Sequence, residues 1–70
     1  MSEDIRKENR FDALKKKYEA DIAIAKAELE VYFESSVGVA EHLHIIESMD
    51  KLMTDLANAQ EKLACLLDNF

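Results

Sequence analysis

A glutamate and two histidines near the middle of the chain are the residues best suited to chemistry. Within a helix, Glu41 and His44 form a Glu-x-x-His motif, with which four-helix bundles bind two metal ions. Two copies of the chain would supply two such motifs, and Glu28 or Glu34 could complete the ligand set. A heptad pattern that includes His42, however, turns Glu41 to a flank and His44 to solvent. We therefore expect no metal and no cofactor, with Glu41 and His44 as the alternative metal ligands.

The single cysteine does not indicate catalysis. A cysteine nucleophile needs a base beside it, and both histidines stand at the far end of the same predicted helix from Cys65. Cys65 and the aromatic side chains are therefore interpreted as core packing. A further hypothesis for the histidines is titration near neutral pH, which would loosen their end of the fold. The chain also lacks a glycine-rich phosphate loop, so we expect a protein that is not an enzyme.

An apolar period of about 3.5 residues runs through the C-terminal half of the chain. Such a period, sustained over four heptads, is typical of a helix with one continuous apolar face. Its members follow His42 at alternating steps of three and four residues: Ile45, Met49, Leu52, Leu56, Ala59, Leu63, Leu66 and Phe70. The pattern predicts a helix over about residues 41–68.

The N-terminal half predicts another helix, over about residues 3–36. Its apolar face is formed by Phe11, Leu14, Tyr18, Ile22, Ala25, Leu29 and Tyr32. Proline is absent and Gly38 is the one glycine, so a turn over about 37–40 is the expected break. If the chain folds back there, Phe11 lies opposite Leu63 and Ala25 lies opposite Met49. We predict an all-α fold with one domain, residues 1–70, built as an antiparallel, coiled-coil-like helical hairpin.

Each predicted helix has more apolar surface than one neighbour can cover. The first helix carries a second face, formed by Ala20, Ile24, Ala27 and Val31. The other helix carries a flank beside its main face, formed by Ile46, Met53 and Leu67. A chain of 70 residues buries only a small core, and association is the supplement open to it. We predict that these residues join two hairpins into a homodimeric four-helix bundle, with a tetramer or a helix of another protein as the alternatives.

The charge of the chain is unevenly distributed. The net charge is −6, yet residues 1–17 hold six basic and four acidic side chains. A basic arm for nucleic acid would bring a duplex against the acidic remainder, so we expect no nucleic-acid partner. No apolar run approaches the length of a membrane span, and the charged start lacks a signal-peptide core. We expect no membrane association and a cytoplasmic location. Binding as an acidic decoy is a further hypothesis.

The second half of the chain also resembles small helical proteins of marine tailed phages. The similar segments, mainly within residues 37–70, are Val37 to His42, Ile45 to Glu47, Met49 to Leu52, Leu56 to Ala59, and Lys62 with Leu63. Where those proteins carry Pro or Ser with Asp after the Glu-His pair, this chain has Leu43 and His44. The resemblance implies a helical accessory protein of a phage, acting in the host cytoplasm, and it supplies no catalytic residues. A non-catalytic interaction module is therefore the predicted function.

Overall fold

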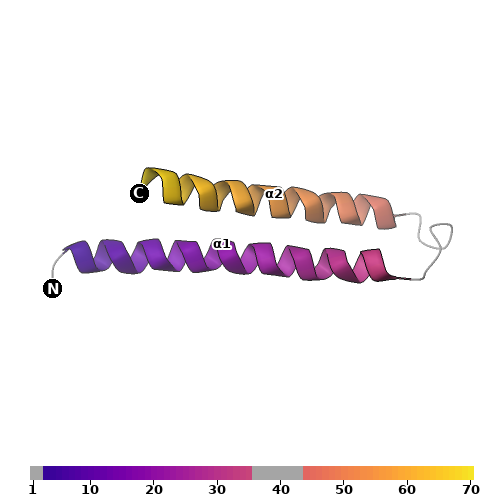
Figure 1. Cartoon of the computed structure of the whole chain (residues 1–70), viewed down its shortest axis with the longest axis horizontal. Helices are drawn as coiled ribbons and strands as arrows, with labels where there is room; N and C mark the ends of the chain where they lie inside the picture. The colour runs from indigo at the N-terminus through magenta and orange to yellow at the C-terminus, as the bar shows by residue number, and fades with distance from the viewer. Residues whose placement is uncertain (1–2, 36–43) are drawn as a thin grey trace.

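The fold is an antiparallel pair of helices. The computed structural model describes residues 3–35 and 44–70, with side chains from residue 5 onward. Helix α1 spans Glu3–Glu34 and helix α2 spans Ile45–Asn69. The two lie side by side and run in opposite directions (Figure 1). The predicted all-helical hairpin is confirmed, while the predicted turn over 37–40, Gly38 and the predicted helix start at 41 lie outside the described residues.

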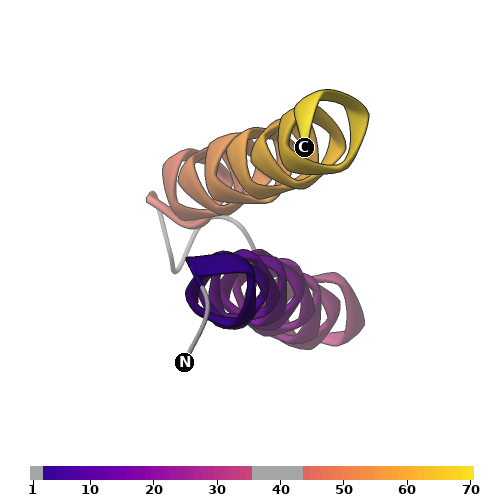
Figure 2. The ribbon, with the colours of Figure 1, turned by 90° about the vertical axis from the view of Figure 1, so that its left-hand side faces the viewer.

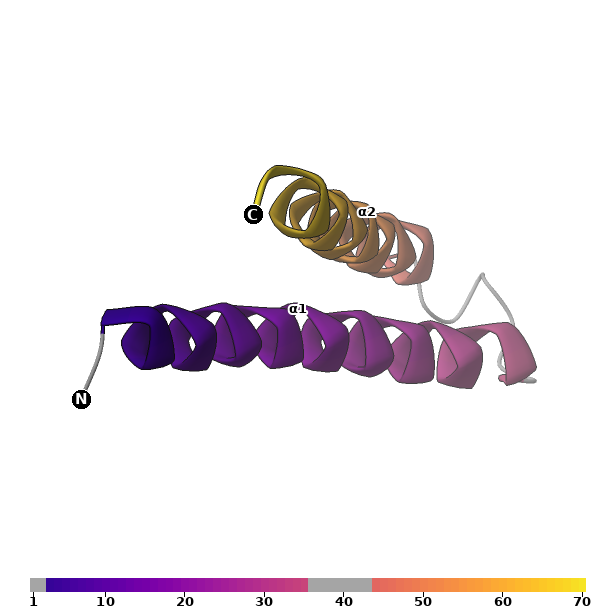
Figure 3. The ribbon, with the colours of Figure 1, turned by 60° about the vertical axis from the view of Figure 1, so that its left-hand side comes forward.

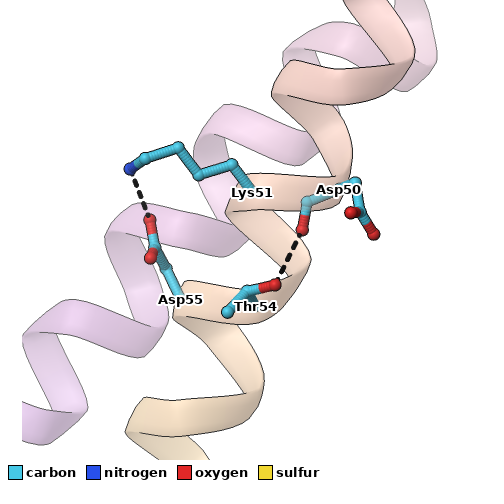
Figure 4. A network of polar contacts seen from close by, with 4 residues as sticks. All are labelled: Asp50, Lys51, Thr54 and Asp55. Carbon is cyan, nitrogen blue, oxygen red and sulfur yellow. Dashed lines mark hydrogen bonds and ion pairs between the residues drawn. The ribbon is translucent and has the colours of Figure 1, made fainter.

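Short-range pairs support both helices on their solvent sides. Oppositely charged side chains four residues apart meet on one helix surface, where each pair is worth a few tenths of a kcal/mol. In α2, Lys51 Nζ donates to Asp55 Oδ2 at 3.5 Å, and Thr54 Oγ1 donates to the Asp50 carbonyl at 3.2 Å (Figure 4). The backbone N–H of Phe70 closes the C-terminal end of α2 by donating to the Leu66 carbonyl at 3.1 Å.

The core is a thin strip between the two helices. Its most buried members are small or aliphatic and come from both helices: Ala25, Leu29, Ala59 and Leu66. Around them, half-buried members of the two predicted apolar faces extend the strip: Phe11, Tyr18, Ile22, Tyr32, Ile45, Met49, Leu52, Leu56 and Leu63. The heptad pattern therefore identified the contact faces correctly, because residues at alternating steps of three and four share one side of a helix.

The pairing of the two faces differs from the prediction. Phe11 was expected opposite Leu63, but it lines a hollow together with Leu66 and Phe70. Likewise Ala25, expected opposite Met49, lines a groove with Leu52 and Ala59. Helix α2 is thus displaced by roughly one to two turns along α1 relative to the predicted register. A displacement close to one heptad keeps the same faces in contact, so the apolar match survives it.

Some side chains interpreted as core packing lie in solvent. Phe33 is 70% exposed and Phe70 is 80% exposed. Leu14 and Cys65 are also exposed, so the core assignments of all four were wrong. Both aromatic residues lie at the end of a helix: Phe33 stands within the last turn of α1 and Phe70 follows α2 directly.

The hairpin is long and thin. Its principal extents are 58 × 17 × 14 Å, and its radius of gyration of 16.8 Å exceeds the roughly 11 Å of a compact domain of this length. The helix axes cross at an angle, as packed side-chain ridges require (Figures 2 and 3). Helix α1 also extends past the C-terminal end of α2 (Figure 1). A two-helix layer of this shape covers one side of each helix and leaves the others bare.

Candidate interaction surfaces

The second face of α1 is bare. Ile24 is 57% exposed and Val31 is 69% exposed, and Ala20 and Ala27 between them are exposed as well. Each residue advances about 100° around a helix, which places this face about 150° from the buried side of α1. It therefore points largely away from α2, with Ile24 at the edge of a groove that α2 also lines. No rotation of α2 within the hairpin could cover it.

The flank of α2 is bare as well. Ile46 is 61% exposed, Leu67 is 51% exposed and Met53 is 48% exposed. The flank lies about 90° from the buried side of α2, at the edge of the contact with α1. The structure therefore places all seven residues that the sequence assigned to an interface at the surface. Their role as an interface stays a prediction.

The second face and the flank lie on opposite sides of the hairpin. Ile24 lines a groove of about 340 Å³ together with Lys62 and Asn58 of α2. Lys62 follows Met53 by two and a half turns, so the two side chains leave α2 on opposite sides. The second face thus belongs to the Lys62 side and the flank to the Met53 side. One neighbouring helix cannot contact both surfaces.

A hollow with a basic rim occupies the end where α1 extends past α2. It has a volume of about 580 Å³, and it is lined by Arg6, Lys7, Arg10, Phe11, Leu14, Leu66 and Phe70. The apolar part comes from both helices, whereas the cations all come from α1. Sequence reasoning missed this hollow, because it placed α2 in a different register. The excess of basic residues before residue 18 was the signal that could have marked it.

Two pairs of opposite charges form among the described side chains of α1. Lys16 Nζ lies 2.8 Å from Asp12 Oδ2, and the hydrogen bond between them raises the pKa of Lys16 above 10.5. Lys17 Nζ donates to Asp21 Oδ2 at 2.9 Å, and this bond likewise raises the pKa of Lys17. Both pairs are exposed, so they contribute little to stability. The charged side chains of α1 outside these two pairs are the ones that could pair with a neighbouring chain.

Of the two alternative metal ligands, Glu41 and His44, the structure describes His44. His44 lies in solvent just before α2, and its Nδ1 stands 3.3 Å from Glu47 Oε2. Glu41 and His42 lie outside the described residues. Within residues 3–35 and 44–70, no three His, Cys, Asp or Glu side chains are grouped so that they could hold a metal ion. The described residues therefore provide no observation that favours the metal alternative.

Comparisons with known proteins do not indicate a function for the chain. No family model, no curated protein and no solved structure matches the chain. The resemblance to phage proteins therefore stays a prediction. Neither of the helices that the structure describes is long and apolar enough to span a membrane. The exposed surfaces of the hairpin are thus the features that bear on function.

Proposed function

We propose that the chain is a non-catalytic interaction module that associates with a second copy of itself through helix packing. The observation that carries this proposal is the bare second face of α1, where Ile24 and Val31 are more than half exposed. Apolar residues that are exposed singly are ordinary on protein surfaces. Here they instead form a continuous row with heptad spacing. A row with this spacing is the surface that one helix presents to another.

The total exposed surface supports association. A compact monomer of 8.0 kDa would expose about 4,450 Å². The hairpin exposes 5715 Å², which is about 1,250 Å² more. A stable interface of ordinary size takes about 800 Å² from each partner. The elongated shape of the hairpin thus exposes more surface beyond that of a compact monomer than one such interface would cover.

The assembly that these surfaces favour is a dimer of hairpins with four helices. The second face and the flank lie on opposite sides, so a dimer built on one leaves the other free for a tetramer or for a helix of another protein. We place such a module in the cytoplasm, and the phage resemblance adds the proposal that it serves as a viral accessory protein. No observation favours an enzymatic or metal-storage role over this one.

Light scattering across a range of protein concentrations tests self-association. We expect a mass of twice 8.0 kDa at high concentration. Ile24→Glu would bury two unpaired charges in the dimer and should weaken it by at least about a hundredfold. The matched control is Thr54→Glu, which adds the same charge to an exposed position on α2 outside the flank and should leave the dimer intact.

Two outcomes would count against the proposal. A folded 8.0 kDa monomer at every concentration would contradict self-association and would leave these surfaces to a helix of another protein. A dimer that survives Ile24→Glu but dissociates with Met53→Glu would move the interface from the second face of α1 to the flank of α2.

A further inference from the structure

We infer that the second copy lies antiparallel across α1, with Arg10 of each chain beside Glu34 of the other. This inference rests on the proposed self-association and specifies its orientation and register. It starts from the two ends of the second face. The alternating spacing continues past Ala20 through Lys17 and Ala13 to Arg10, and it continues past Val31 to Glu34. The extended row thus has a cation at one end and an anion at the other, and between them Lys17 interrupts its apolar members.

The charged side chains at the two ends of this row are free to pair with a second copy, as far as the described residues show. Arg10 and Glu34 are exposed. Among the side chains that the structure describes, neither takes part in an ion pair, whereas Lys17 is already paired with Asp21. An antiparallel neighbour would bring Arg10 and Glu34 together twice, once at each end of the contact. Charge pairs at the edge of a helix interface set orientation in this way.

Side-chain sizes support the same register. Centring the contact near residue 22 places Ala20 opposite Ile24 of the second copy and Ala13 opposite Val31. Each large apolar side chain then faces an alanine, which lets the two helices approach closely in those layers, and Lys17 faces Ala27. In the same register, Lys16, which is already paired with Asp12, comes beside Glu30 of the second copy. Asp21 approaches its own copy there, but Lys17 at 2.9 Å offsets that charge.

The competing arrangements are less favourable. A parallel pair would set Arg10 against Arg10 and Lys17 against Lys17, and like charges at such positions repel. An antiparallel pair displaced by one heptad would set Lys17 against Glu34, but it would also bring Asp21 beside Glu28 twice. It would further shorten the overlap of the two helices by about a quarter, because Arg10 would pass beyond the end of α1.

The long-range charge distribution agrees with the antiparallel choice. The cations Arg6, Lys7 and Arg10 surround the hollow at one end of the hairpin. The described acids at the other end are Glu28, Glu30, Glu34, Glu47 and Asp50. The end with the hollow also carries Glu8, Glu61 and Asp68, so the charge difference lies along α1. An antiparallel pair of α1 helices places the cations of each copy near the acids of the other. Two hairpins in the same orientation would place cations beside cations and acids beside acids.

A charge-swap experiment on the dimer tests the contact between Arg10 and Glu34. Each of Arg10→Glu and Glu34→Arg replaces two attractive contacts by two repulsive ones, so each should weaken the dimer about tenfold in an ultracentrifugation titration. The double variant restores opposite charges and should bind within about threefold of the unmodified protein. The control Lys26→Glu makes the same charge change as Arg10→Glu on a side of α1 away from the second face, and it should change the dimer constant far less.

A distance measurement tests orientation independently. In a Cys65→Ser background, a spin label at Glu8→Cys lies about 14 residues from the centre of the proposed contact. The two labels of an antiparallel dimer should then stand roughly 40 Å apart, compared with roughly 20 Å or less in a parallel dimer. Circular dichroism confirms that each variant keeps its helices.

The outcomes separate the two proposals. A protein that never dimerises overturns both self-association and the antiparallel contact. A dimer whose constant responds to Arg10→Glu no more than to Lys26→Glu, or that the double variant fails to restore, overturns the antiparallel contact alone. A short label separation does the same, since it shows a parallel dimer.

Discussion

The two apolar sides of α1 have similar spacing and opposite surroundings. Leu29 is 4% exposed and Val31, two residues later, is 69% exposed. Both belong to rows with three-and-four spacing on the same helix. The difference is that α2 covers one row, whereas Ile24 and Val31 of the other row remain more than half exposed. An apolar row therefore indicates that a helix needs a neighbour, but it does not identify which neighbour satisfies it.

Helix α2 shows how a chain of this kind gains stability from a single contact. Its apolar residues form one broad side, of which α1 covers the middle and leaves the flank at the edge. Helix α1 instead divides its apolar residues between two nearly opposite sides. A helix of the second type lies naturally between two neighbours in a layer. The stability of the hairpin should therefore depend on one side of α1 and its association on the other.

The largest difference in stability should come from truncating one residue on each apolar side of α1. In the Ile24→Glu background, where self-association is removed, Leu29→Ala should lower the free energy of unfolding by about 3 kcal/mol, because it leaves a cavity in a thin core. Val31→Ala in the same background should change it by less than about 0.5 kcal/mol. Urea denaturation followed by circular dichroism measures both. Equal losses would show that the second face of α1 is packed within the monomer.

A smaller difference in stability should follow from enlarging an alanine on each apolar side of α1. Ala25 is 3% exposed between the helices, so Ala25→Leu should overpack the core and cost about 1–3 kcal/mol. Ala27 belongs to the second face, and Ala27→Leu should leave the stability of the monomer nearly unchanged. Thermal denaturation of the two variants in the Ile24→Glu background provides the comparison. A tolerated Ala25→Leu would indicate that the helices separate easily.

The smallest effect should come from the exposed lysine pairs of α1. Because the folded state raises the pKa of Lys16 and Lys17, their stabilisation is complete below the unfolded value of 10.5 and is lost as the pH rises through the folded values. The melting temperature should thus decline slightly above about pH 10.5. In an Asp12→Asn, Asp21→Asn variant this contribution should vanish, so its melting temperature should fall less over the same range. An identical decline would assign the effect to other groups.

The candidate surfaces could be predicted as sets of residues but not as places on the molecule. Ile24 and Val31 share a face because of helix geometry alone, and the same holds for Ile46 and Met53. That the two sets lie on opposite sides of the hairpin depends on how α2 is rotated against α1. The hollow around Arg10 was not predicted, because it exists only where α1 extends past the end of α2.

The sequence by itself determined that the chain is helical, where its two helices lie to within a few residues, and which side of each is buried. These properties are local, since 3.6 residues per turn decide which side chains share a face. The tertiary structure decided the register, which moved by roughly one to two turns from the simplest match of apolar faces. A heptad pattern repeats, so registers that differ by one heptad bury similar apolar surface, and only the packed arrangement of both helices distinguishes them.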